Sequence, residues 1–104
     1  MMQKVSQIFI SDNNQEMSLK LKKNLETLKN IYFDYKYTLY NNNTIEEFLL
    51  ENYDENIIKT YRKLKPYSYK SDFARYCILY KQGGWYFDIG LKVVKRVQVE
   101  NETS

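Results

Sequence analysis

Two carboxylates and one arginine near the end of the chain have the types and spacing of a site for a charged ligand. They lie in the segment KSDFARYCILYKQGGWYFDIGLK, residues 70–92. Asp72 and Arg75 are three residues apart, so a helix would place them on one face. A guanidinium is a forked, permanently charged donor, and carboxylate oxygens are the ligands that hard divalent cations prefer. A second acid, Asp88, follows a glycine pair.

The local sequence predicts a helix that presents Asp72 and Arg75 together, then a turn and a strand that ends at Asp88. Ser71 is a good N-cap residue, so we expect a helix from Asp72 to Gln82 that ends at Gly83-Gly84. Trp85 to Phe87 is typical of a short buried strand, and Asp88 then falls at its carboxyl end. Open α/β sheets bind ligands beyond the carboxyl ends of their strands. Asp88 is therefore expected at the rim of such a crevice.

The remaining sequence predicts an α/β fold, with alternating strand and helix patterns. The order β-α-β-α-α-α-β-β fits a mostly parallel sheet flanked by helices, in one domain that spans residues 1–104. The other expected elements are a strand from Val5 to Ile10, a helix capped by Asn13 and Glu16, a strand from Phe33 to Tyr40, a helix capped by Thr44 and Glu47, a helix that starts at Asp54 and ends before Pro66, and a strand-like run of Leu91, Val93, Val97 and Val99.

The pattern K-S-D, R-Y, L-Y, G-G and an aromatic strand followed by Asp resembles glycosyltransferases that have a sugar-binding region containing a DXD motif. These include family 32 mannosyl- and galactosyltransferases and capsular polysaccharide enzymes. The stretch VSQIFISDN, residues 5–13, is similar to the first strand of this family. The matching residues are Lys70, Ser71, Asp72, Arg75, Tyr76, Leu79, Tyr80, Gly83, Gly84, Tyr86 and Asp88.

The resemblance implies a GT-A-like, Rossmann-related fold and a retaining enzyme. It would transfer a sugar from a nucleotide-diphosphosugar donor to a glycan or lipid-linked acceptor, in bacterial surface polysaccharide synthesis. Mn²⁺ or Mg²⁺ would offset the charge of the leaving diphosphate. Gly90 stands where the motif has its second acid, so we expect weaker metal binding unless another ligand fills that place. The implied donor-binding residues are Asp72, Arg75, Tyr76, Gly84 and Asp88, with Asp88 also on the metal.

Length and composition narrow the setting. The family's catalytic domain is longer than 104 residues, so we expect the donor-binding part of an enzyme whose missing C-terminal half would be its partner. A net charge of +3 does not require a nucleic-acid partner. The sequence has no signal-peptide pattern and no membrane-spanning stretch, which predicts a cytoplasmic protein and leaves peripheral association with the inner membrane open. Cys77 is expected to be buried and structural.

Less specific interpretations stay open at this stage. Asp72 and Arg75 could form an ordinary surface ion pair, and Trp85 could simply belong to the core. The chain could be a remnant that binds nucleotide sugars without transferring them, as Gly90 would favour. Alternatively, its lysine-rich helices could bind a membrane surface, which would require no nucleotide-sugar site.

Overall fold

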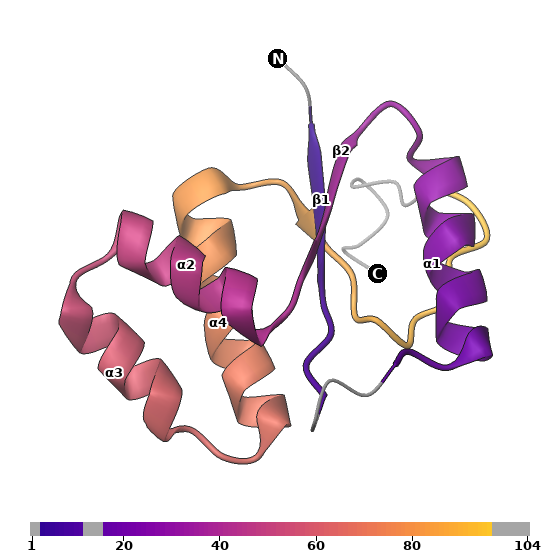
Figure 1. Ribbon diagram of the computed structural model, residues 1–104. Helices are drawn as coiled ribbons and strands as arrows, with labels where there is room; N and C mark the ends of the chain where they lie inside the picture. The colour runs from indigo at the N-terminus through magenta and orange to yellow at the C-terminus, as the bar shows by residue number, and fades with distance from the viewer. Residues whose placement is uncertain (1–2, 12–15, 97–104) are drawn as a thin grey trace, which may run out of the picture.

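Three parallel strands form a small sheet between two helical layers in the computed structural model, which describes residues 3–11 and 16–96 (Figure 1). The strands are β1 (Lys4–Ile8), β2 (Lys36–Tyr40) and β3 (Trp85–Tyr86), and the helices are α1 (Leu19–Ile31), α2 (Asn42–Asn52), α3 (Glu55–Lys63) and α4 (Tyr67–Gln82). The strand order is β2-β1-β3, and β1 pairs in parallel with both neighbours. The predicted α/β class is confirmed, and the layout is consistent with part of a GT-A-like domain.

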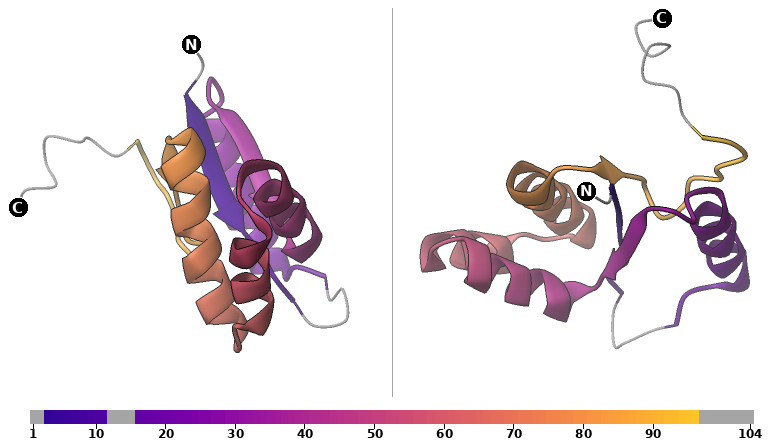
Figure 2. Two further views of the ribbon diagram at one scale, coloured as in Figure 1. Left: turned by 90° about the vertical axis from the view of Figure 1, so that its left-hand side faces the viewer. Right: turned by 90° about the horizontal axis from the view of Figure 1, so that it is seen from above.

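The larger part of the core lies between the sheet and helices α2, α3 and α4. Ile8 of β1 and Tyr40 of β2 face this side. They pack with buried residues of the three helices, namely Ile45, Leu49, Ile58, Tyr61, Ala74, Cys77 and Ile78. Figure 2 shows these helices together on one side of the sheet. We call this side the helical face. Cys77 is buried there, as predicted, and burial raises the pKa of its thiol.

The opposite side of the sheet has a smaller core, which we call the α1 face. Val5 of β1 and Leu28 and Tyr32 from the α1 side are buried there. The chain that follows β3 completes this core with Phe87 and Val93. Figures 1 and 2 show this segment beside α1, on the side away from α4. The segment that contains Asp88 therefore lies between β3 and the α1 face.

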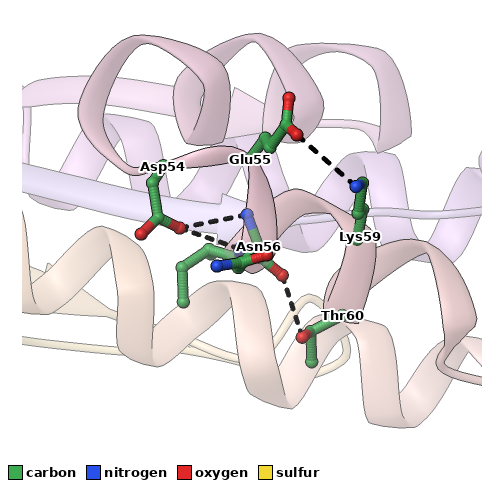
Figure 3. Close-up of polar contacts among 6 residues, drawn as sticks. Asp54, Glu55, Asn56, Lys59 and Thr60 are labelled. Atoms are coloured by element: carbon green, nitrogen blue, oxygen red, sulfur yellow. Dashed lines mark hydrogen bonds and ion pairs between the residues drawn. The ribbon is translucent and has the colours of Figure 1, made fainter.

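The helix caps agree with the sequence prediction at α3 and differ at α1 and α2. Asp54 caps α3 as predicted, because its carboxylate accepts hydrogen bonds from the backbone N–H of Asn56 and Ile57 (Figure 3). Helix α2 is capped by Asn41, which forms a capping box with Thr44, so the prediction of Thr44 as the cap was wrong. Helix α1 begins after Ser18, and the predicted cap Asn13 lies outside the described residues.

Helix α4 begins four residues before the predicted N-cap Ser71. Pro66 occupies the N-cap position, and its carbonyl accepts a hydrogen bond from the N–H of Tyr69. The start of a helix tolerates proline, because the N–H that proline lacks would have no partner within the helix there. Asp72 is therefore inside the helix, and its predicted place in the first turn was wrong.

Two predicted strands differ from the structure. The second strand begins at Lys36 and not at Phe33, because Tyr32 to Tyr35 forms a turn closed by a backbone hydrogen bond. Residues 91–96 form no strand, and the rest of that predicted strand lies outside the described residues. The chain turns at Asp88, where the carbonyl accepts a hydrogen bond from Leu91 N–H. It then packs Val93 against α1 instead of joining the sheet.

No helix among residues 3–11 and 16–96 combines the length and the apolar character that crossing a membrane requires.

Candidate functional site

Helix α4 is fixed on the helical face by its buried residues, and its exposed side presents Asp72 and Arg75. Ala74, Cys77 and Ile78 anchor the helix in the core. Asp72 and Arg75 lie one turn apart, and Arg75 Nη2 is 3.3 Å from Asp72 Oδ1. The predicted pair therefore forms, with the arginine side chain only 28 % exposed. This partial burial limits the directions in which the guanidinium can point.

Lys70 anchors the first part of α4 to α3. Its Nζ donates a hydrogen bond to the carbonyl of Tyr61 at 3.1 Å and lies 4.3 Å from the centre of the Tyr61 ring. Burial lowers the pKa of Lys70, which the nearby Arg62 and Lys65 also lower while Glu46 raises it. Lys70 belongs to the motif on which the family resemblance rests, and in this structure its contacts hold the α3–α4 junction.

The glycine pair allows β3 to enter the sheet. Gly83 ends α4 with φ of 69°, and Gly84 follows with φ of 91°. A Cβ atom on Gly84 would lie 2.6 Å from the carbonyl oxygen of Lys4, so only glycine lets the chain approach β1 this closely. Gly84 lies at the amino end of β3, and Asp88 follows its carboxyl end. The predicted contact of Gly84 with a donor stays a prediction, whereas its close packing against β1 is evident.

Asp88 joins the pair on α4. Its Oδ1 lies 3.7 Å from Arg75 Nη1, and its side chain is 76 % exposed. Arg75 thus lies between two carboxylates from two elements, and we call Asp72, Arg75 and Asp88 the Arg75 cluster. Both ion pairs are accessible to water and therefore weak. A stronger anion such as a phosphate could replace one of these carboxylates at small cost.

Two tyrosines lie beside the Arg75 guanidinium. Its central carbon is 5.2 Å from the Tyr76 ring centre and 5.4 Å from that of Tyr86. Burial raises the pKa of Tyr86 to about 12; Asp88 and Asp72 also raise it, whereas Arg75 lowers it. Tyr86 therefore stays neutral near pH 7. Tyr76 is exposed, and it also lines a shallow apolar hollow of about 550 Å³ between α4 and Tyr53 at the end of α2. Its predicted role in donor binding stays a prediction.

A hydrogen-bonded amide behind Asp88 was missed by the sequence interpretation. Gln7 lies on β1, is 2 % exposed, and donates from Nε2 to the carbonyl of Asp88 at 3.3 Å. Its Oε1 accepts a hydrogen bond from the Tyr37 hydroxyl at 2.7 Å. The available signal was the polar pair Ser6-Gln7 within the otherwise apolar run from Val5 to Ile10. Buried polar side chains in a strand need partners, and these partners come from distant parts of the chain.

The residues present fit a divalent ion only in part. Among the described residues, no three His, Cys, Asp or Glu side chains gather closely enough to hold a metal. Asp88 is exposed and can supply one carboxylate oxygen, and Gly90 supplies none. Mg²⁺ often takes only one or two protein carboxylates and completes its shell with water and substrate phosphates. The chemistry of Asp88 therefore fits a metal that is shared with a bound diphosphate.

Comparisons with known proteins relate this chain to glycosyltransferases. Residues 18–104 match the family model described as the glycosyltransferase sugar-binding region containing DXD motif. The chain is 33 % identical over 87 residues to an uncharacterized glycosyltransferase of Acanthamoeba polyphaga mimivirus. That alignment covers 84 % of this chain and 34 % of the relative, so the chain spans about a third of the relative's length. No solved structure matches the chain.

Proposed function

Because the chain belongs to the glycosyltransferase family whose sugar-binding region contains a DXD motif, we propose that it binds the nucleotide-diphosphosugar donor of a sugar transfer. The Arg75 cluster is the observation that supports this most. It places a partly buried guanidinium between two carboxylates, at the edge of the sheet that follows the carboxyl end of β3. Parallel α/β sheets bind ligands at this edge.

Each residue of the cluster has a role that suits its chemistry. Arg75 binds the diphosphate, because its forked guanidinium can donate two parallel hydrogen bonds to phosphate oxygens. Asp72 accepts hydrogen bonds from hydroxyl groups of the sugar. Asp88 would supply one carboxylate ligand to a Mn²⁺ or Mg²⁺ ion. The tyrosine rings beside Arg75 keep its guanidinium in place while the ligand enters.

The cluster would promote transfer through positioning and charge stabilisation. The nucleoside diphosphate gains negative charge as its bond to the sugar breaks. Arg75 is a permanent positive charge at that place, and its partial burial strengthens the interaction relative to bulk water. A divalent metal bound there supplies further Lewis-acid stabilisation. We assign no catalytic base or nucleophile among these residues.

The finer features of the reaction belong to the proposal as well. By family resemblance, the transfer retains the configuration of the sugar, and a glycan or lipid-linked molecule accepts it. Synthesis of a bacterial surface polysaccharide in the cytoplasm, at the inner membrane, is the setting we propose. The alignment covers only 34 % of the relative, so residues beyond this chain would supply the acceptor site.

Donor binding without transfer is the second candidate function, and Gly90 favours it. A metal held by one carboxylate depends more on the donor phosphates than a metal held by two. The third interpretation, a basic membrane-binding surface, has less support. Three of the basic helical side chains are paired with acids, since Lys22 contacts Glu16, Lys59 contacts Glu55, and Arg62 contacts Glu46.

Calorimetric titration with UDP-, GDP- and CMP-sugars, with and without Mn²⁺, tests the proposal. We expect one diphosphate donor to bind, and the CMP-sugars, which have a single phosphate, to bind more weakly. Arg75→Ala and Asp88→Ala should each weaken that binding at least tenfold, because each removes a charge-assisted contact worth about 1.5–3 kcal/mol.

Arg62→Ala is the matched control for this titration. Arg62 also pairs with a carboxylate on a helix surface, but its partner is Glu46 on α2, away from the Arg75 cluster. Circular dichroism confirms that each variant is folded. A folded chain that binds none of these donors, or an Arg62→Ala effect equal to that of Arg75→Ala, would contradict the proposal.

A further inference from the structure

We propose that Gln7 is a positioning residue that fixes the place of Asp88, through a buried amide bridge from β2 across β1 to the segment after β3. The side chain contacts both ends of this bridge: Tyr37 on β2 and the Asp88 carbonyl. Asp88 is 81 residues from Gln7 in the sequence, so the contact is purely tertiary. The inference rests on the proposed function only in giving Asp88 a ligand to bind.

The end of β3 leaves Asp88 just beyond the sheet. This strand has two residues, and its last backbone bond to β1 runs from the N–H of Phe87 to the carbonyl of Ser6 at 3.2 Å. Asp88 lies one residue further and has left the ladder of backbone hydrogen bonds. Its carbonyl accepts from Leu91 N–H, which closes the turn, and from Gln7 Nε2, which ties that turn to the sheet. Among the contacts that the structure describes, the hydrogen bond between Asp88 and β1 therefore comes from the Gln7 side chain.

The direction of the Gln7 amide is set by the Asp88 carbonyl. A glutamine has one accepting and one donating end, and a backbone carbonyl can only accept. Nε2 therefore faces the Asp88 carbonyl, and Oε1 is left to accept a hydrogen bond from the Tyr37 hydroxyl. Burial raises the pKa of Tyr37, and Glu26 raises it further, so the hydroxyl keeps its proton at neutral pH. The Gln7 amide therefore donates to the Asp88 carbonyl and accepts from the Tyr37 hydroxyl.

An amide at this buried position needs a reason other than packing. Burial of an amide costs free energy unless its hydrogen bonds are made, whereas a leucine of similar size has no such cost. Gln7 lies on the same strand as the apolar Val5 and is as deeply buried. Here both ends of the amide are hydrogen-bonded, which offsets that cost, and both bonds connect β1 to other parts of the chain. Its specific effect is to hold one backbone atom of Asp88, and so to aim the carboxylate toward Arg75.

Gln7→Leu tests the inference, with Gln82→Leu as the matched control. Gln82 is a second amide that bonds to the sheet, since its Nε2 lies 3.3 Å from Ser6 Oγ and from the Tyr40 hydroxyl. It reaches the sheet from α4 and makes no described bond to Asp88. Tyr37→Phe removes only the hydroxyl that donates to Gln7 Oε1, and it is the test if the leucine variant fails to fold.

Two measurements separate this inference from the proposed function. Hydrogen exchange of the Leu91 amide in the free chain reports the Asp88 turn directly. Titration with Mn²⁺ and UDP-glucose, or whichever donor binds the wild-type chain, reports its effect on the site. We expect Gln7→Leu to speed Leu91 exchange and to weaken donor binding about fivefold to tenfold, the equivalent of one hydrogen bond. Tyr37→Phe should act in the same direction with a smaller effect.

The outcomes are distinct. If the wild-type chain binds no donor, the proposed function fails, and Leu91 exchange still decides whether Gln7 holds Asp88. If Gln7→Leu and Tyr37→Phe leave both the exchange and the affinity unchanged, Gln7 is not a positioning residue. If Gln82→Leu changes Leu91 exchange and affinity as much as Gln7→Leu does, the effect is a general loosening of the sheet, and the inference is overturned.

Discussion

The two faces of the sheet differ in how their cores are built. We expect the larger core to set most of the stability of the fold and the smaller core to set the position of Asp88. The helical face packs residues from three helices, and several of them are fully buried, including Ile45, Leu49 and Ile78. The α1 face has one helix, and the segment after β3 completes it. Asp72 and Arg75 lie on a helix of the larger core, and Asp88 lies in the segment that completes the smaller core. The Arg75 cluster therefore joins the two cores.

Leu49→Ala on the helical face should have the largest effect on stability. Leu49 has no exposed surface, and truncation of a buried leucine costs about 2–5 kcal/mol through lost burial and the remaining cavity. That is a large part of the total stability of a domain of this size. Urea unfolding measures the change. Leu50→Ala is the matched control, because this neighbour is 60 % exposed and should change the free energy of unfolding by less than about 0.5 kcal/mol. Equal effects at both positions would contradict the packing described here.

Gly84→Ala should have the next largest effect, at the point where β3 joins β1. A side chain there would need φ of 91° and would meet the Lys4 carbonyl at 2.6 Å. We expect the free energy of unfolding to fall by more than about 2 kcal/mol, because the backbone strain and the steric clash add. Gly90→Ala is the control, because a Cβ added to Gly90 would have no atom within 4 Å and its φ is outside the left-handed region. A tolerated Gly84→Ala would show that the close approach of the two strands is not required.

The sequence was sufficient for the order of the elements from β1 to β3, for the shared helix face of Asp72 and Arg75, and for the place of Asp88 after the last strand. Periodicity, the glycine pair and the order of elements are local signals, whereas the contact of Asp88 with Arg75 joins two elements and is known only from the structure. The start of α4 was predicted too late because Ser71 is a strong N-cap residue in isolation, whereas Pro66 already begins the helix. Local preference gave way there to the packing of Lys70 against α3.

The parts that could not be predicted depend on contacts between distant residues. The alternation around Val93 is the same whether it pairs in a sheet or packs on a helix, and only the turn at Asp88 decides between them. The contacts of Arg96 could not be predicted for the same reason, since it binds the distant Ile31 carbonyl and Asp34 across the end of α1. Gln7 is the clearest example, because no local pattern indicates a partner 81 residues away.

Val93→Ala should separate stability from site position on the α1 face. Val93 is buried in the smaller core, and loss of two methyl groups costs about 1.5 kcal/mol by area. We expect this smaller loss of stability to be accompanied by faster hydrogen exchange at residues 88–96, whereas Leu49→Ala should act on the whole fold. Val94→Ala is the control, because the Val94 side chain is exposed. If Val93→Ala leaves the exchange of the Asp88 segment unchanged, the α1 face does not set the position of that segment.

Gly90→Asp should have the smallest effect on stability. It tests whether a second carboxylate in the segment after β3 strengthens donor binding. A Cβ at position 90 would meet no atom within 4 Å, and the φ of Gly90 suits any residue, so an aspartate fits without strain. It restores the second acid of the motif two residues beyond Asp88, and a second carboxylate should strengthen Mn²⁺-dependent donor binding about tenfold. Calorimetric titration measures this gain, and Gly90→Asn controls for size without charge. A gain with aspartate alone would mean that the missing acid limits metal binding in this chain. An equal result for aspartate and asparagine would mean that the turn at residues 88–91 aims position 90 away from the donor, so that Asp88 is the one carboxylate of this turn that can reach it.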